Sequence, residues 1–190
     1  MRSVLFFVAL VLEVAICRIV ELRLSRRHQR ELAARGAALV PEPGFGAMVA
    51  LHTGILIAAV VEVIAFHRPF VAAVGIPALV LVALASALRF WVIATLGLHW
   101  NVRVVPSLGL GVVTRGPYRF IRHPNYVAVF VELTALPLVH GAVVTAVVGA
   151  ALHVAVLHRR IALEESVLMA DDSYRRAFAA KPRFVPWRMS

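Results

Sequence analysis

Apolar residues occur along this chain in long unbroken blocks, and polar residues gather between the blocks. A helix needs about 20 apolar residues to cross a bilayer, so a block of that length predicts a transmembrane span. Such blocks predict spans at residues 3–22, 45–66 and 70–96. Pro69, between the second and third blocks, is able to end one helix and begin the next.

A fourth apolar block, at residues 125–158, is too long for one span. The sequence "LPLVHGA" interrupts it near the middle, where Pro137 and Gly141 disfavour a continuous helix. We therefore expect a tight hairpin of two shorter helices. With the three earlier spans, this pattern predicts an all-α integral membrane protein with about five transmembrane helices.

Composition supports the same class of protein. Hydrophobic residues make up 61% of the chain and the mean hydropathy is +0.85, both well above the values of soluble domains. The first block could alternatively be a signal peptide with Cys17 as a lipid-attachment residue. The bulky Ile16 before this cysteine, and Glu13 inside the block, favour a first span instead. One cysteine cannot build a disulfide framework or a cysteine metal site within the chain, so we expect Cys17 to be a small core residue.

Positive charge is concentrated beside the apolar blocks. The net charge is +10, which in a soluble protein would suggest nucleic-acid binding. Here sixteen of the twenty Lys and Arg residues lie in the segments 23–35, 97–124 and 159–190. Because Lys and Arg favour the cytoplasmic side of spans, these segments are predicted to be cytoplasmic and the N-terminus to lie outside. The expected surroundings are a lipid bilayer and no nucleic acid.

Two polar motifs fall on this predicted cytoplasmic side. The stretch "TRGPYRFIRHPNY", at residues 114–126, combines rings with arginines, which by itself is typical of a membrane-interface belt. If residues 154–170 continue the last helix, Arg160 and Glu164 lie on one face. By themselves they would form an exposed ion pair worth about 0.3 to 0.5 kcal/mol. The combination of the two motifs favours a functional site.

"RHPNY", followed after a helical hairpin by "RxxxEE", resembles the isoprenylcysteine carboxyl methyltransferase family from about Leu96 to Phe178. The resemblance implies an integral membrane O-methyltransferase that uses S-adenosylmethionine and releases S-adenosylhomocysteine. It implies a cytoplasmic cofactor pocket in the C-terminal half, with Arg160 contacting the substrate and forming the catalytic pair with Glu164. The implied cofactor contacts are Leu110, Gly111, Val112, Val113, Tyr118, His123, Pro124, Asn125, Tyr126 and Glu164.

The sequence "WNVRVVP", at residues 100–106, resembles a bacterial branch of this family that is associated with type III polyketide synthases. The resemblance implies a lipophilic small-molecule acceptor, such as a long-chain alkylpyrone, and a location in a bacterial inner membrane. A prenylated protein fits this branch poorly. The chain is accordingly divided into three spans with a basic loop and a catalytic region, at residues 1–96 (loop 23–35) and 97–190 (loop 97–124, hairpin 125–158, C-terminal helix and tail 159–190).

The chemistry of the implied cofactor suits these residues. Its amino-acid part and sulfonium require an acid for the ammonium, donors for the carboxylate and an aromatic wall. Glu164, His123 and either Tyr118 or Tyr126 can supply them. Gly111 and Gly116, in "GLGVVTRG" at residues 109–116, permit close backbone approach. They do not open a helix after a strand, however, so no Rossmann domain is expected.

Methyl transfer requires the acceptor oxygen and the methyl carbon to meet in line, so positioning and desolvation are expected to supply most of the rate. A carboxylate acceptor needs no base, whereas an enol or phenol has a proton to lose. Arg160 could stabilise the oxyanion in either case. His99 is a candidate base, although a histidine beside Trp100 at a helix end is more often an interfacial anchor.

Charges inside the predicted spans are costly unless they are paired. We expect partners for Glu13, Glu62, Arg89 and Glu132, and the first pairing we predict is Arg89 with Glu132. A metal site is not expected, because the histidines lack helical ligand spacing with a carboxylate. His52 and His153 are expected to be hydrogen-bonded core residues.

Two other classes of function remain open at this stage. A non-enzymatic membrane module, such as a small transporter or an assembly partner, would also carry buried charges. A nicotinamide-dependent membrane reductase is the other alternative, because a related superfamily includes enzymes with a similar C-terminal half. Binding of S-adenosylhomocysteine or of NADPH separates these classes.

Overall fold

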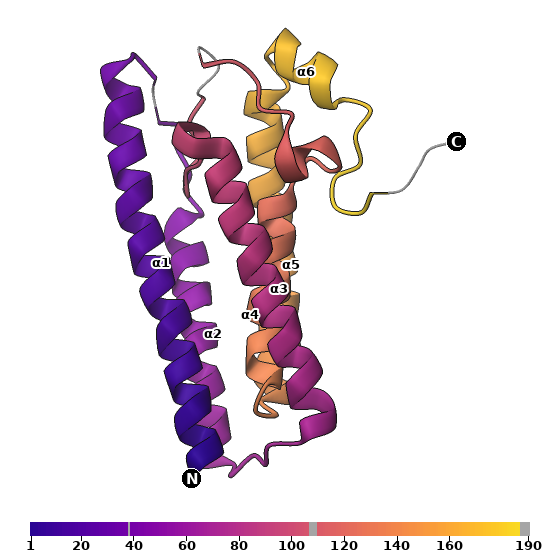
Figure 1. The fold of residues 1–190 in the computed structure, drawn as a ribbon. Coiled ribbons are helices and arrows are strands. Elements are labelled where there is room, and N and C mark those ends of the chain that lie inside the picture. Colours follow the sequence, from indigo (N-terminus) through magenta and orange to yellow (C-terminus); the bar gives the residue numbers. More distant parts are fainter. Residues whose placement is uncertain (38, 107–109, 187–190) are drawn as a thin grey trace.

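A computed structural model describes residues 1–37, 39–106 and 110–186, and within these ranges the chain contains helices and no strand (Figure 1). The all-α class is therefore confirmed, and the described residues contain no Rossmann domain. The helices are α1 (Arg2–Ala34), α2 (Phe45–Ala65), α3 (Ala72–Leu96), α4 (Pro124–Leu138), α5 (Val143–Leu168) and α6 (Asp172–Phe178), with 3₁₀ turns η1 (Gly97–His99) and η3 (Gly116–Arg119).

Helices α1 to α5 run alongside one another as an up-and-down bundle (Figure 1). The N-terminus and the turn between α4 and α5 lie at one end, which we call the N-terminal end. The last turns of α1, the described parts of the connection from α3 to α4, and α6 lie at the other end, the C-terminal end. The described parts of the three arginine-rich segments therefore gather at the same end of the bundle.

Four helices are long and apolar enough to cross a membrane: α1, α2, α3 with its 3₁₀ extension, and α5. Their outward faces carry large apolar side chains such as Leu12, Ile57, Leu84 and Val147, which is the surface a lipid bilayer requires. The fifth predicted span is α4, whose 15 residues extend only about 22 Å at 1.5 Å per residue. Four described spans thus meet the length requirement, and α4 is a shorter apolar helix.

Helix α4 lies at the centre of the bundle. Nine of its fifteen residues are buried, and it packs against α2, α3 and α5. The apolar core continues from α4 into α1 through Phe7 and Val11. The predicted hairpin is confirmed, because α4 ends at Leu138 and α5 begins at Val143. This central position brings the start of α4, where the "HPNY" motif lies, against the end of α5.

Two sequence predictions about helix boundaries were wrong. The basic segment 23–35 is not a loop, because α1 continues through it to Ala34. Arginine, leucine, glutamate and glutamine are good helix formers, and Gly36, with a φ of +87°, is the first residue that stops the helix. Pro69 does not begin a helix, since α2 ends at Ala65 and α3 begins only at Ala72.

Candidate functional site

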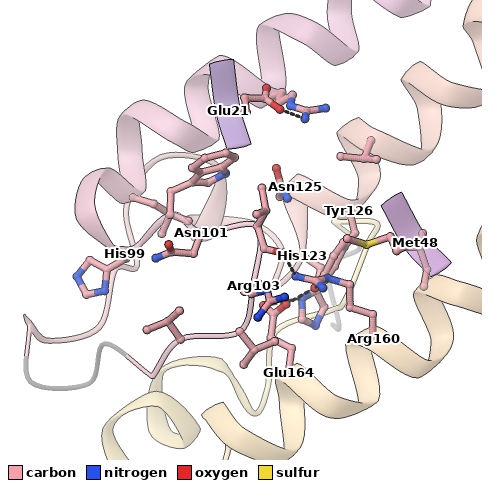
Figure 2. Close-up of a pocket in the computed structure, with 18 of the residues that line it drawn as sticks. Glu21, Met48, His99, Asn101, Arg103, His123, Asn125, Tyr126, Arg160 and Glu164 are labelled. Atoms are coloured by element: carbon pink, nitrogen blue, oxygen red, sulfur yellow. Dashed lines mark hydrogen bonds and ion pairs between the residues drawn. The ribbon is translucent and has the colours of Figure 1, made fainter. Parts of the chain in front are cut away.

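A cavity of about 400 Å³ lies towards the C-terminal end of the bundle. Its walls come from α1, α2, α4, α5 and the connection between α3 and α4, so residues distant in sequence meet there (Figure 2). Polar side chains from the two motifs form one part of the wall. Apolar side chains of the transmembrane helices form another part, including Ile19, Leu22, Met48, Val49, Leu56, Leu133 and Leu157.

The cavity gathers most of the predicted site residues. Its wall includes Gly111, Val112, Val113, Tyr118, His123, Asn125, Tyr126, Arg160 and Glu164. Two predicted cofactor contacts, Leu110 and Pro124, are not part of this wall. Leu110 is exposed, and Pro124 is buried as the first residue of α4, where its fixed φ suits the start of a helix. The motif therefore places the rings of His123 and Tyr126 in the cavity wall, and Pro124 between them lies outside it.

Tyr126 joins the two motifs. Its hydroxyl donates to Glu164 Oε2 and accepts from Arg160 Nε at 3.0 Å. Arg160 also forms an ion pair with Glu42 and donates to the carbonyl oxygen of Val102. The alternative of an exposed Arg160–Glu164 ion pair was therefore wrong. Both side chains converge on a buried phenol instead, and Arg160 is neutralised by a different carboxylate.

His123 is held by a second carboxylate that the sequence analysis did not single out. Its Nε2 lies 2.9 Å from Glu165 Oε1, and its Nδ1 lies 3.9 Å from Glu164 Oε1. Glu165 also pairs with Arg122 and Arg183. Because His123 is buried and one ring nitrogen is occupied, its ring orientation is fixed. The "EE" doublet was the available signal, since two adjacent acids on a helix point in different directions.

The C-terminal segment packs on this motif. The backbone N–H groups of Arg122 and His123 donate to the carbonyl oxygens of Pro182 and Arg183, at 2.9 and 3.0 Å. The ring of Phe184 lies 6.1 Å from that of His123, centre to centre. These contacts fix the backbone just before α4. The tail after α6 is thus part of the support of the site.

Glu42 was also missed by sequence reasoning. It lies in the connection between α1 and α2, and its side chain is only 4% exposed. Besides pairing with Arg160 it accepts the backbone N–H of Val104. No motif contains it. The available signal was an acid flanked by two prolines directly before an apolar span.

Tyr118 and the two predicted glycines shape the loop side of the cavity. Burial of the Tyr118 phenol away from water raises its pKa well above the usual value. This hydroxyl therefore stays neutral near pH 7. Gly116 has a φ of +58°, and a Cβ there would lie 2.5 Å from Thr95 Oγ1. The close approach permitted by Gly116 is therefore to α3. Gly111, with a φ of +81°, faces open space and lines the cavity.

Charges inside the spans are mostly paired, as expected. Arg89 Nη1 lies 3.2 Å from Glu132, which confirms the predicted pair, and Arg18 and Glu21 extend it into a four-residue network. Glu13 is the exception, because it is exposed and forms no ion pair within the described part of the chain.

Three further predictions concern the pair His52 and His153, the residue Cys17, and His99 beside Trp100. His52 and His153 contact each other with 3.2 Å between their Nε2 atoms, which confirms the predicted hydrogen bonding. Cys17 is only half-buried, so the prediction of a core position holds in part. His99 and Trp100 both line the cavity, and Trp100 is buried, which is not the position of a lipid-facing anchor.

Comparison with known proteins agrees with the resemblance inferred from the two motifs. The sequence model of the isoprenylcysteine carboxyl methyltransferase (ICMT) family matches residues 78–170, about half of the chain, and this range includes both motifs. The match supports this family, a family of methyltransferases.

Two curated proteins are similar over a longer range. "Uncharacterized protein YpbQ" of Bacillus subtilis (strain 168) is 27% identical over 152 residues, which cover 80% of this chain and 89% of that protein. An "Uncharacterized protein" of Haemophilus influenzae (strain ATCC 51907 / DSM 11121 / KW20 / Rd) is 29% identical over 152 residues, covering 80% of this chain and 88% of that protein. Both similarities cover a longer part of this chain than the match to the family model does.

Proposed function

We propose that the protein is an integral membrane methyltransferase that transfers a methyl group from S-adenosylmethionine to an oxygen atom of a lipophilic acceptor. The observation that carries this proposal is the continuity of one cavity. Its wall joins His123, Tyr126 and Glu164 to apolar side chains of membrane-spanning helices. A polar cofactor that enters from water can therefore meet an acceptor whose apolar chain stays in the bilayer.

The residues present fit this cofactor. Glu164 is 26% exposed along its side chain, and no hydrogen bond reaches its Oε1 within the described residues, so a carboxylate oxygen is available for the ammonium group. Tyr126 provides an aromatic wall and Tyr118 a neutral hydroxyl. A cavity of about 400 Å³ also lies within the range of roughly 300 to 1,000 Å³ that small-molecule sites occupy.

When bound, S-adenosylmethionine supplies an electrophilic methyl group on a sulfonium centre. The contribution of this chain is to bind, orient and exclude water. We propose that Glu164, with His123 beside it, holds the amino-acid part. Gly111, Val112 and Val113 approach through their backbone, and Asn125 is proposed to complete this side of the site, whereas Leu110 and Pro124 lie outside the cavity wall.

Arg160 is proposed to act at the acceptor oxygen. Of the five N–H donors of an arginine, three are used by Tyr126, Glu42 and Val102, so two are left for the acceptor. A carboxylate or an ionised hydroxypyrone needs no base at all. An un-ionised enol or phenol would need one, and His99 in the cavity wall is the proposed candidate.

The acceptor we propose is a long-chain alkylpyrone or a related lipid, with its headgroup in the cavity and its tail among the transmembrane helices. The proposed orientation places the C-terminal end of the bundle at the cytoplasmic face of a bacterial inner membrane. The basic residues in the described parts of the three segments at that end support this orientation.

Methyl transfer from labelled cofactor tests the proposal. Purified protein in detergent is given S-adenosylmethionine with a labelled methyl group and a panel of long-chain hydroxypyrones and carboxylates, together with their short-chain, water-soluble counterparts. We expect label in the long-chain products. Label only in the water-soluble acceptors, or none in any acceptor while NADPH is consumed, would contradict the proposal and in the latter case favour a reductase.

A further inference from the structure

Arg103 and Arg160 are two of the arginines that line the cavity, and they differ in how their charge is balanced (Figure 2). Arg160 is paired with Glu42, so its positive charge is compensated within the chain. Arg103 has no carboxylate partner within residues 1–37, 39–106 and 110–186. Its guanidinium carbon lies 4.5 Å from the centre of the Phe45 ring, and both residues belong to the cavity wall. Among the described arginines of the cavity wall, Arg103 is therefore the one without a carboxylate partner.

The backbone on both sides of Arg103 is fixed. The carbonyl oxygen of Val102 accepts from Arg160, and the N–H of Val104 donates to Glu42. The carbonyl oxygen of Val104 also accepts from the backbone N–H of Val40 at 3.2 Å. An arginine normally loses much conformational entropy when it binds a ligand. Here the anchored backbone and the contact with the Phe45 ring already restrict Arg103 before a ligand binds. Less conformational entropy therefore remains to be lost on binding.

The geometry points to Arg103 as the residue that binds the anionic group of the acceptor. This inference rests on the proposed methyltransferase function and makes its substrate class more specific. The acceptor is a negatively charged amphiphile, with a carboxylate or enolate headgroup and an apolar chain. A neutral lipid would leave the guanidinium of Arg103 without a partner, whereas an anion both neutralises the cation and matches its planar fork of donors.

The position of Arg103 favours the acceptor over the carboxylate of the cofactor. Phe45, against which it packs, begins α2, and Met48 one turn further along lines the apolar side of the cavity. The proposed cofactor contacts come instead from residues 110–126 and from α5. Through its contact with Phe45, Arg103 therefore adjoins the apolar part of the cavity wall. In this arrangement Arg160 donates hydrogen bonds near the reacting oxygen, and Arg103 supplies the opposite charge.

Direct binding of matched probes tests the inference. Decanoate and decanol share one apolar chain and differ in charge, and each is titrated by calorimetry into the full-length protein in a neutral detergent, with and without S-adenosylhomocysteine. We expect the wild type to prefer decanoate, and Arg103→Gln to bind decanoate at least about tenfold more weakly with decanol unchanged. Arg103→Lys keeps the charge and should retain part of the preference.

Arg119→Gln is the matched control. Arg119 also lies against an aromatic ring, that of Phe120 at 5.7 Å, in the same connection between α3 and α4, but it is exposed and outside the cavity wall. Its variant should bind both probes as the wild type does. Equal affinity of the wild type for decanoate and decanol would overturn the inference, and so would unchanged decanoate binding by Arg103→Gln.

Affinity for S-adenosylhomocysteine separates this inference from the proposed function. If Arg103→Gln binds S-adenosylhomocysteine as tightly as the wild type, the arginine does not hold the cofactor carboxylate, as we expect. Weaker binding in this variant would assign Arg103 to the cofactor and overturn the inference. If the wild type itself fails to bind S-adenosylhomocysteine but keeps an Arg103-dependent preference for decanoate, the methyltransferase proposal fails while the anion site stands.

Discussion

Each end of helix α5 meets a glutamate inside the bundle, and the two carboxylates differ in how fully they are satisfied. At the N-terminal end, Glu62 accepts from the backbone N–H groups of Val144 and Thr145 and from the Thr145 hydroxyl. It also pairs with Arg68 at 2.9 Å, and its side chain is 6% exposed. At the C-terminal end, Glu164 is 26% exposed and accepts a hydrogen bond from Tyr126 through one oxygen.

The difference is in the hydrogen-bonding capacity that each carboxylate has left for a ligand. Glu62 binds the positive end of a helix dipole, and both of its oxygens are occupied by groups of the chain. Its role is complete within the fold. Glu164 and its neighbours line a cavity and keep unused hydrogen-bonding capacity. The chain occupies both oxygens of Glu62, whereas one oxygen of Glu164 stays accessible, and we propose that a ligand binds there.

Orientation in the membrane gives the largest expected effect, because a reporter signal is all or none. Reporter fusions after Arg35, Arg68, Gly116 and Ser190 should read cytoplasmic, external, cytoplasmic and cytoplasmic. The physical reason is the gathering of basic residues at the end that carries Glu164. An external signal at Gly116 would place the cavity on the wrong side of the membrane for a cytoplasmic cofactor.

Removal of Glu62 should mainly affect stability. Glu62→Ala leaves the half-exposed Arg68 and the buried donors of Thr145 without their partner, and a buried donor left unsatisfied typically costs about 1 to 3 kcal/mol. We expect a clear fall in the thermal unfolding temperature in detergent. Protein that remains folded should bind S-adenosylhomocysteine normally. An unchanged unfolding temperature would show that this end of α5 does not depend on Glu62.

Replacement of Arg160 should mainly affect turnover. Arg160→Lys keeps the charge but loses the fork that contacts Tyr126, Glu42 and Val102 together. We expect methylation of a long-chain hydroxypyrone or carboxylate to fall on the order of a hundredfold, as for the loss of an oxyanion donor. Affinity for S-adenosylhomocysteine should change little. Comparison of labelled product formed by wild type and variant measures this, and equal turnover would exclude Arg160 from the reaction.

The helices were predictable because hydrophobic length is a local property of the sequence. The spans at 45–66 and 70–96 agree with α2 and α3 to within a few residues. The continuation of α1 through 23–34 was not predicted, because a run of arginines was interpreted as a loop although nothing in it disfavours a helix. Charge determines where a helix leaves the membrane, and it does not determine where the helix ends.

The site was predictable only where a motif contained the residue. His123, Tyr126, Arg160 and Glu164 meet as expected, since a central hairpin brings the start of α4 to the end of α5. The four-residue network around Arg89 was predicted only as a pair. Glu42 was missed because its partner lies more than a hundred residues away, and such proximity exists only in the folded bundle.

Calorimetric titration of S-adenosylhomocysteine into wild type and Glu164→Gln is the most direct test of the account. The account predicts that the wild type binds S-adenosylhomocysteine and not NADPH. Glu164→Gln should bind it at least tenfold more weakly, a loss of about 1.4 kcal/mol or more from one charge-assisted hydrogen bond. Binding of NADPH in place of S-adenosylhomocysteine, or equal affinity of wild type and Glu164→Gln, would contradict the assignment of this cavity to the cofactor.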